Sequence, residues 1–363
     1  SLYRLLITDD TWARQRAEFG YRDVRPHHLI EDFCGQPYVD IRASLNSFVP
    51  AQLSNHSADK FIESYLCLLQ DNPQLHDKIE FDVVFTIWTP SFESEALERL
   101  TPYGVSNLQI SEMGQALKSI TQKAILRLEG DIKPIRSMIE RRSLLEASLM
   151  APIDKAMMLL SDCRRFGALA FAHAARAGFV ATSFLKSFVA LEILTEMDKL
   201  EFLKTIKTVA SEFEKDGIAV SNGQLSKEQY IEHYGHLRPG TYDASVEAYW
   251  EAPERYLFSK HKSLRNAAKE EIPFHFSKSS RNAIENEIGK IDKGISFNSF
   301  IEYIVGAIQA REYVKFQFTR NLSRALDSII KYGLDLGIGR EEVTFLNVSD
   351  LDQLKTGALS EKN

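Results

Sequence analysis

The sequence predicts a mainly α-helical protein with a small β-containing N-terminal lobe, an α+β arrangement in which long helices form one large helical body. Three observations support this fold class. From about Ser106 onward, apolar residues recur at helical spacing almost throughout. Before that point, two stretches are rich in β-branched and aromatic residues. No internal repeat of about 20 to 50 residues is present, so a solenoid is not expected.

Residues 1–102 are expected to form the small α/β lobe. The stretch "GQPYVDIRASLNSF" favours a first strand at 38–41, and "KIEFDVVFTIW", residues 78–88, favours a second. Between them, "SADKFIESYLCLLQ" places apolar side chains at helical spacing behind a Ser57 cap. Two strands around one helix are therefore predicted.

Residues 103–363 are expected to form the helical body. Amphipathic or alanine-rich patterns predict helices over 106–128, 134–148, 153–184 with a break at Gly178, 198–215 and 227–232, with a polar loop over 216–226. The loop is predicted from its run of small and polar residues.

The C-terminal third is expected to begin with an irregular region over 244–278, in which two prolines prevent long helices. One long helix follows over about 297–332, closed by Gly333 just after its end. Such a helix would be roughly 50 Å long and could link separate lobes. The tail is predicted to form a short turn or strand and then a helix capped by Asp350.

Composition excludes several function classes. The chain has 44 Lys and Arg residues and 50 Asp and Glu residues, well mixed, with a net charge of -6. A nucleic-acid surface needs a dominant positive field, so small molecules or proteins are the expected partners. The most apolar window, 167–194, is interrupted by charged and polar residues, and no membrane span is expected.

Three distant cysteines, Cys34, Cys67 and Cys163, form no CxxC pair, which fits a reducing cytoplasm. The first residues lack both an initiating Met and the layout of a signal peptide. We therefore expect a cytoplasmic chain that is one piece of a longer polypeptide.

Signatures of cofactor and metal binding are weak. Gly333, Gly337 and Gly339 follow a predicted helix and lack the strand-to-helix context and Lys-Ser/Thr ending of a P-loop. His233 and His236 are three residues apart without an H-E-x-x-H pattern. No cofactor and no metal are expected in this chain, and a metal hydrolase built on the two histidines is the weakest alternative.

The stretch "HYGHLRPGTYDAS", residues 233–245, is the strongest candidate for a binding loop. Arg238 offers a planar fork of donors suited to a carboxylate or phosphate, and the Pro-Gly pair that follows forces a turn that would expose this fork. The further candidates for substrate binding in and beside the RPGTYD loop (238–243) are His236, Thr241, Tyr242 and Asp243. The structural alternative is that Arg238 pairs with Asp243 to hold a tight turn while Tyr242 packs inward.

A second candidate is the segment "DIRASLNSF". If Asp40 to Ser44 is a strand, Arg42 shares a face with Asp40 and Ser44, and Asn46 adds an amide at the strand's end. The structural alternative is an ordinary strand with a solvated polar face.

A third basic feature lies on the long helix. Arg311, Lys315, Arg320 and Arg324 recur at spacings of four, five and four residues. They stay on one broad side of the helix, which is usually only a solvated face.

Several of these stretches together resemble the phosphoenolpyruvate synthase and pyruvate phosphate dikinase-like phosphotransferases. The segments that carry the resemblance, in this order, are "GQPYVDIRASLNSFVP", "FLKTIKTVASEFEKD", "YGHLRPGTYDAS" and "AREYVKFQFTRNLSRALDSIIKYGLDLGIGREEVTFLNVSDL". The chain is most similar to the central, acceptor-side region of the subgroup that includes bacterial glutamine kinase. The string "GHLRPGTYD" is the most specific part.

The resemblance implies a relay in which an ATP-grasp domain phosphorylates a histidine on a mobile domain, which delivers the phosphoryl group to an acceptor. This chain departs from the family because it has neither the phosphohistidine motif nor an ATP-grasp signature. It therefore resembles an acceptor-binding and linker module whose partners are those two domains and a small acceptor such as glutamine. ATP and Mg would belong to the parent enzyme, and this chain alone is expected to be catalytically silent.

The alternative within the same resemblance is a structural spacer between the ATP-grasp and phosphohistidine domains. A concave polar pocket that joins Arg238 to Arg42 favours the acceptor module. Burial of the Arg238 fork favours the spacer.

Overall fold

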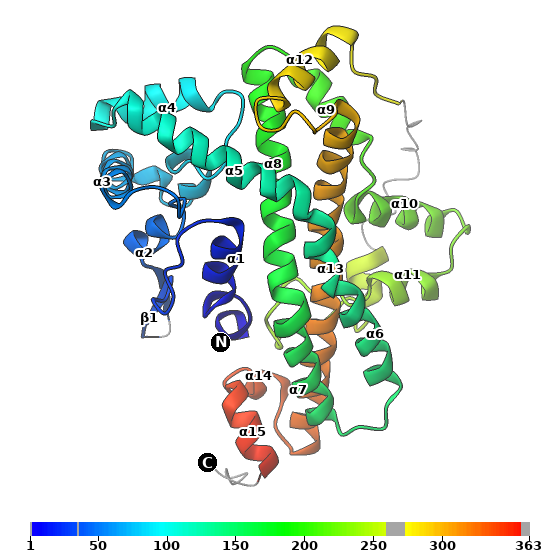
Figure 1. Ribbon diagram of the computed structural model, residues 1–363. Helices are drawn as coiled ribbons and strands as arrows, with labels where there is room; N and C mark the ends of the chain where they lie inside the picture. Colours follow the sequence, from blue (N-terminus) through cyan, green and yellow to red (C-terminus); the bar gives the residue numbers. More distant parts are fainter. Residues whose placement is uncertain (1, 35, 259–272, 357–363) are drawn as a thin grey trace.

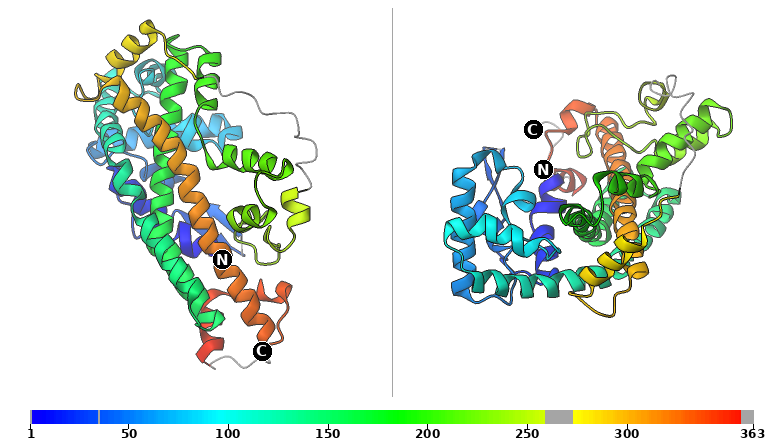
Figure 2. Two further views of the ribbon diagram at one scale, coloured as in Figure 1. Left: turned by 90° about the vertical axis from the view of Figure 1, so that its right-hand side faces the viewer. Right: turned by 90° about the horizontal axis from the view of Figure 1, so that it is seen from above.

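The computed structural model describes residues 2–34, 36–258 and 273–356. Two long helices form the centre of the molecule and lie side by side over most of their length (Figures 1 and 2). The first is a continuous helical segment made of α7 (Pro152–Asp162), the π-helical turn η5 (Cys163–Ala168) and α8 (Leu169–Ala190). The second is α13 (Phe297–Asp335), which has 39 residues and runs in the opposite direction.

The remaining helices pack around this pair. In the N-terminal part they are η1 (Arg4–Thr8), α1 (Thr11–Phe19), α2 (Ile41–Asn46), α3 (Asn55–Asp71), η2 (Pro73–Leu75), η3 (Ile79–Val83), α4 (Phe92–Leu100) and η4 (Thr101–Tyr103). In the body they are α5 (Asn107–Ile132), α6 (Pro134–Ala147), α9 (Glu196–Lys204), α10 (Val209–Ser221), α11 (Lys227–Tyr234), η6 (Glu254–Phe258), α12 (Lys278–Ile288), α14 (Arg340–Val343) and α15 (Val348–Thr356).

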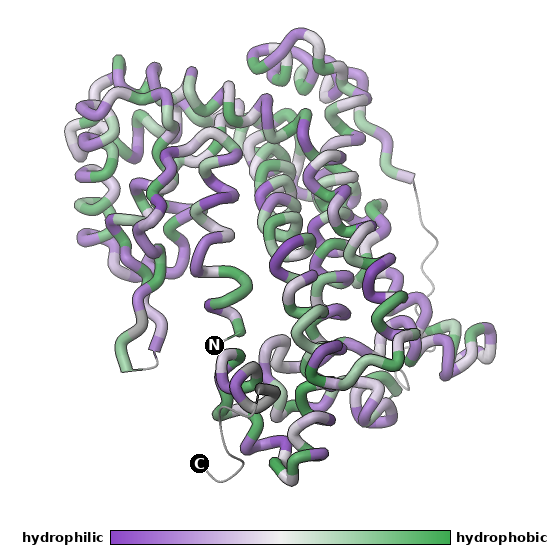
Figure 3. The backbone as a smooth tube through the Cα atoms, turned by 60° about the horizontal axis from the view of Figure 1, so that its bottom comes forward, coloured by the Kyte–Doolittle hydropathy of each residue, from purple (hydrophilic) through white to green (hydrophobic). Residues whose placement is uncertain are grey.

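The N-terminal elements lie on one side of the central pair, and α10 and α11 lie on the opposite side (Figures 1 and 2). One cluster of buried apolar residues joins the two parts, because it includes Phe19 and Phe61 from the first 102 residues as well as Phe184 of α8 and Phe300 of α13. Hydrophobic and hydrophilic residues alternate along the long helices, as Figure 3 shows. This pattern is that of amphipathic helices that bury one side against a neighbour.

The expected fold class, mainly α with a small β part, is confirmed. Within the described residues the only sheet is a hairpin, in which β1 (Ile30–Phe33) pairs antiparallel with β2 (Gln36–Val39). The predicted first strand therefore ends at Val39, before the site segment that follows it.

The strand predicted over 78–88 is wrong. Its first part is the π-helical turn η3, and the buried residues after it use side chains as hydrogen-bond partners: Phe85 N donates to Tyr65 Oη at 3.3 Å and Trp88 N donates to Thr121 Oγ1 at 2.9 Å. The β-branched and aromatic composition reflects burial in the core rather than pairing in a sheet.

The prediction of one helix over 198–215 is also wrong. The chain leaves α9 at Lys204, and Thr208 then starts α10 by accepting a hydrogen bond from Ser211 N. As a result, α10 extends to Ser221 through half of the predicted loop. Thr208, four residues after the end of α9, is a typical N-cap residue, and the apolar spacing that continues across it concealed this helix start.

Two glycine predictions need correction. Gly178 does not break the helix over 152–190; it lies inside α8, where an added Cβ would stand 3.0 Å from Arg311 Cδ. Gly333 lies inside α13, and Gly337, with φ +78°, is the glycine that follows the end of that helix. In the tail, the segment predicted as a turn or strand is the short helix α14, and α12 was not predicted.

The helical segment 152–190 contains an 18-residue window that is long and apolar enough to cross a membrane by length and composition alone. In this molecule 61% of that window is buried. It therefore has the packing of a core helix.

Candidate functional site

The candidate binding loop begins where α11 ends and folds back on itself. Tyr249 N donates to Leu237 O at 2.8 Å and Trp250 N donates to Gly235 O at 2.9 Å, so the two limbs of the loop are held together by backbone hydrogen bonds. The chain bends at 239–240, as the Pro-Gly pair predicts. These bonds fix the positions of the side chains between them.

The Arg238 fork is turned inward against α13. Its Nη2 donates to Asp327 Oδ1 at 2.8 Å and to Ser323 Oγ at 3.4 Å, and its Nη1 donates to Val246 O. The side chain is 2% exposed. Arg238 thus ties the loop to the long helix; it pairs neither with Asp243, as the structural alternative proposed, nor with solvent.

The acids beside Arg238 form a short network. Glu251 lies 3.9 Å from the guanidinium and also pairs with Arg340. Burial raises the pKa of Asp327, although the neighbouring Arg238 acts in the opposite direction, and burial likewise lowers the pKa of Arg238. Both shifts mean that this ion pair is partly desolvated.

His236 is almost completely buried, with 1% of its surface exposed. Its ring contacts Phe316 edge to face, with centroids 4.4 Å apart, and neither ring nitrogen makes a hydrogen bond of ordinary geometry with a described residue. Burial lowers the pKa of His236 to about 3, and the nearby Arg320 and Arg142 lower it further. The imidazole is therefore neutral at neutral pH and can offer one donor and one acceptor.

The other three candidate residues of the loop lie in different environments. Thr241 lines the cavity described below together with His236 and Arg238. Tyr242 packs edge to face on Tyr3, with ring centroids 5.2 Å apart, and does not line that cavity. The carboxylate of Asp243 accepts from Ser245 N at 2.8 Å and from Ser245 Oγ, so it holds the turn.

A cavity of about 700 Å³ lies between this loop, α10, α11 and α13. Its aromatic lining residues are Phe213, Tyr234, Tyr249, Tyr256 and Phe316. Its charged lining residues, apart from Arg238, are Glu214, Arg311, Glu312 and Lys315. The mixture of aromatic rings, two cations and two carboxylates is typical of a site that binds a small polar molecule.

Two members of the basic ladder face this cavity and two do not. Arg311 and Lys315 line it, and no described residue makes a hydrogen bond or ion pair with either side chain. Arg324 instead bonds Glu146 at 2.8 Å, while Arg320 lies close enough to shift the pKa of buried Arg142. Residues four apart lie on the same face of a helix, and this spacing predicts that Arg311 and Lys315 point to one side of α13.

Arg42 and Asn46 do not join this site. The predicted strand at Asp40–Ser44 is the start of α2, because the Asp40 carboxylate accepts a hydrogen bond from Ala43 N at 2.8 Å and caps the helix. Asn46 Nδ2 donates to Arg42 O at 2.9 Å within the same helix. α2 lies in the N-terminal part, across the central pair from α10 and α11 (Figure 1), so no common pocket joins Arg42 to Arg238.

The sequence analysis missed the aromatic walls and the two carboxylates. Glu312 follows Arg311 on α13 and accepts a hydrogen bond from Ala210 N, at the start of α10, at 3.2 Å. Glu214 lies one turn further along α10. No local pattern identifies these residues, because they meet the loop only through the tertiary packing of α10 on α13.

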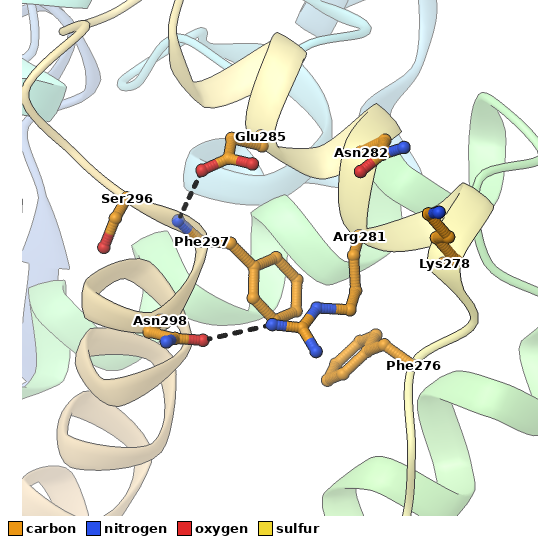
Figure 4. A pocket seen from close by; sticks show the side chains of 8 residues that line it. All are labelled: Phe276, Lys278, Arg281, Asn282, Glu285, Ser296, Phe297 and Asn298. Carbon is orange, nitrogen blue, oxygen red and sulfur yellow. Dashed lines mark hydrogen bonds between the residues drawn. The ribbon is translucent and has the colours of Figure 1, made fainter.

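A more open pocket of about 440 Å³ lies between α12 and the start of α13 (Figure 4). Its polar side chains are largely occupied with the local fold: Arg281 stacks on Phe297 and donates to Asn298 at 3.5 Å, and Glu285 accepts from Phe297 N at 3.5 Å. The contacts drawn in Figure 4 thus join α12 to the start of α13.

In the described ranges, no group of three or more His, Cys, Asp or Glu side chains has the arrangement of a metal site. His233 packs edge to face on Tyr234, with ring centroids 4.5 Å apart.

Comparisons of the chain with protein families, with curated proteins and with solved structures find no match.

Proposed function

We propose that this chain is the acceptor-binding and linker module of a cytoplasmic, ATP-dependent phosphotransferase similar to phosphoenolpyruvate synthase. The cavity between α10, α11, the 235–251 loop and α13 would hold a small acceptor such as glutamine for transfer from a phosphohistidine on another domain. The observation that carries the proposal is the lining of this cavity, in which free cationic groups, carboxylates and aromatic rings meet.

The charge of the lining fits a zwitterion. Arg311 and Lys315 can bind a carboxylate, while Glu214 and Glu312 can bind an ammonium group. A polyanion such as ATP needs an excess of positive charge, which this lining lacks because its two acids offset its two unpaired cations. An amino acid with a neutral amide side chain therefore suits the cavity better than a nucleotide.

The volume also fits a small acceptor. Ligand cavities span about 300 to 1,000 Å³, and the cavity here measures about 700 Å³. Neutral His236 and the loop held by Arg238 form part of its wall. A wall held in place by backbone and ion-pair contacts reduces the ordering cost of binding.

The proposal assigns no catalytic residue to this chain. The ATP-grasp and phosphohistidine domains, ATP and Mg are expected on other parts of the parent polypeptide. Positioning of the acceptor and exclusion of water are the contributions that this cavity would make to phosphoryl transfer.

The spacer alternative is favoured by one observation. The Arg238 fork, which belongs to the most specific string of the resemblance, contacts α13 and the loop backbone through Nη1 and Nη2. With 39 residues, α13 is roughly 58 Å long, which suits a rigid spacer. A spacer does not require a cavity with unpaired cations, and binding measurements therefore separate the two functions.

The test is isothermal titration calorimetry of the chain with L-glutamine, pyruvate, phosphoenolpyruvate and ATP. Lys315→Met should weaken binding of L-glutamine by about 10- to 150-fold, since one charge-assisted contact is worth about 1.5 to 3 kcal/mol. Lys331→Met, further along α13 and outside the cavity lining, is the matched control and should bind like the unmodified chain. Absence of binding for every compound would support the spacer, and equal binding of L-glutamine by Lys315→Met would place the ligand outside this cavity.

A further inference from the structure

A second cavity, of about 300 Å³, lies on the side of α8 that faces the N-terminal part. It is formed by η1, α1, η3, η5 with α8, and the Arg311 side chain of α13. Its lining carries a larger excess of positive charge than the lining of the 700 Å³ acceptor cavity.

Two of its lining residues are buried arginines. Arg16 is 8% exposed and Arg176 is 5% exposed. The Arg16 guanidinium stacks on Phe48, 3.7 Å from the ring centroid, and Nη1 donates to Ser47 Oγ. Arg16 therefore has a hydroxyl and an aromatic ring as its direct contacts, while Glu80 acts on it only as a nearby charge.

Arg176 is better paired but incompletely satisfied. Its Nη1 lies 2.6 Å from Glu80 Oε1 and 3.2 Å from Thr86 Oγ1. Its Nε is buried without a partner among the described residues, and the same holds for Nε2 of Gln15, which also lines the cavity. Unsatisfied buried donors are costly, so two of them beside one cavity indicate a missing acceptor.

The charges around the cavity do not balance. Its positively charged lining residues are Arg16, Arg176 and Arg311, and its negatively charged lining residue is Glu80. Burial lowers the pKa of Arg16 to about 9; the nearby Glu80 opposes this shift and repulsion from Arg176 adds to it, and the group remains charged at neutral pH. Buried positive charge in excess of its counter-ions is unfavourable unless an anion neutralises it.

The rest of the wall is apolar. Its aromatic members are Trp12, Phe81, Phe171 and Phe179, and its small members include Ala172 and Ala175 on α8. The volume is at the lower limit of known ligand sites, which restricts a ligand to about one ring with its substituent. Flat apolar ligands gain from contact with such rings.

We infer that this cavity binds a small aromatic acid, in which a single carboxylate or phosphate group meets Arg16, Arg176 and Gln15 while the ring lies against the aromatic wall. This site is separate from the proposed acceptor cavity, although Arg311 lines both. The inference does not depend on the proposed phosphotransferase function.

The experiment uses calorimetry with benzoate, phenyl phosphate and inorganic phosphate as probes. Benzoate or phenyl phosphate should bind with a Kd of about 1 mM or tighter, and inorganic phosphate at least about tenfold more weakly. Comparison of the two aromatic probes separates a carboxylate ligand from a phosphate ligand. No binding of either aromatic acid up to about 10 mM would overturn the inference.

Two variants locate the binding. Ala172→Leu fills the cavity from a helical position without removing charge, and Gln15→Leu removes one unsatisfied donor; each should weaken binding by about tenfold or more. The control, Ala147→Leu, places the same side chain at an exposed position of α6 and should bind normally. Circular dichroism confirms that each variant is folded before titration, and unchanged binding by a folded Ala172→Leu would place the ligand elsewhere.

The outcome is independent of the glutamine experiment. Lys315→Met should leave benzoate binding unchanged, because Lys315 lines only the first cavity. Loss of aromatic-acid binding in this variant would show that both probes occupy the acceptor cavity, which would contradict a second site.

Discussion

Removal of the Arg238 side chain should destabilise the protein strongly. Arg238→Ala breaks the contacts to Asp327, Ser323 and the Val246 carbonyl that tie the binding loop to α13. Loss of one partner of a buried ion pair costs about 3 to 5 kcal/mol. The Asp327 side chain is 26% exposed and can regain water, so we expect a smaller loss of about 2 to 4 kcal/mol in the free energy of unfolding.

The assay is a double-mutant cycle. Unfolding by urea, followed by circular dichroism, is measured for the unmodified chain, Arg238→Ala, Asp327→Ala and the double variant. The double variant should be more stable than the sum of the single losses predicts, with a coupling of about 1 to 3 kcal/mol. The matched control is Arg255→Ala, whose partner Glu247 lies 3.7 Å away on the surface and whose own side chain is 71% exposed; such a pair is worth at most about 1 kcal/mol.

If the free energy of unfolding of Arg238→Ala lies within about 0.5 kcal/mol of that of the unmodified chain, the contacts to α13 do not hold the loop. If the variant is equally stable but no longer binds L-glutamine, the fork contacts ligand rather than α13.

Two further predictions concern the buried side chains around the central pair. Burial holds the pKa of His236 at about 3 against an ordinary value of 6.5, so the unfolded chain takes up a proton below pH 6.5 that the folded chain does not, and stability is lost as pH falls. Between about pH 8 and about pH 5, the free energy of unfolding of His236→Gln should therefore fall by about 2 kcal/mol less than that of the unmodified chain. Urea unfolding at both pH values measures this difference, and an equal fall in the two proteins would contradict the prediction. An added Cβ at Gly167 would stand 2.7 Å from Phe318 Cδ2 and 3.0 Å from Met138 Sδ, so Gly167→Ala should lower the melting temperature through an overpacking cost of about 1 to 3 kcal/mol. Gly130→Ala, at a site in α5 with no neighbouring atom within 4 Å, is the control and should raise the melting temperature by a gain of about 0.8 to 1 kcal/mol.

The long elements were predictable because their signals are local and repeated. The helix over 297–332 emerged from apolar spacing, and α13 (Phe297–Asp335) confirms it with Ser296 as the N-cap. The helix at 106–128 likewise has its capping box at Ser106. Caps and periodicity act within a few residues, so one sequence suffices to find them.

The strand at 78–88 and the partners of Arg238 were not predictable in the same way. A short apolar run is compatible with any buried conformation, and its backbone partners here, Tyr65 and Thr121, are distant in the sequence. In the sequence, the acid closest to Arg238 is Asp243, whereas its partner in the structure is the distant Asp327. Its choice of Asp327 follows from the packing of the loop on α13, which the sequence does not display.

In the candidate site, too, local patterns were predictable and contacts between distant parts of the chain were not. The loop at 233–245 and the basic pair at 311 and 315 were visible as local patterns, and both line the 700 Å³ cavity. The link to Arg42 depended on a strand that is a helix in the structure. The second cavity combines residues of η1, α1, η3, the continuous helix of η5 and α8, and α13, and its buried arginines look like ordinary helix residues in the sequence.

The measurement that tests the central claim most directly is hydrogen exchange of the chain with and without L-glutamine, read by mass spectrometry. Bound glutamine should slow exchange in the peptides that line the acceptor cavity, at 209–214, 235–241 and 311–319. Exchange in α2 at 41–46 should not change. Protection centred on α2, or no protection anywhere at saturating glutamine, would contradict an acceptor cavity between the loop and α13.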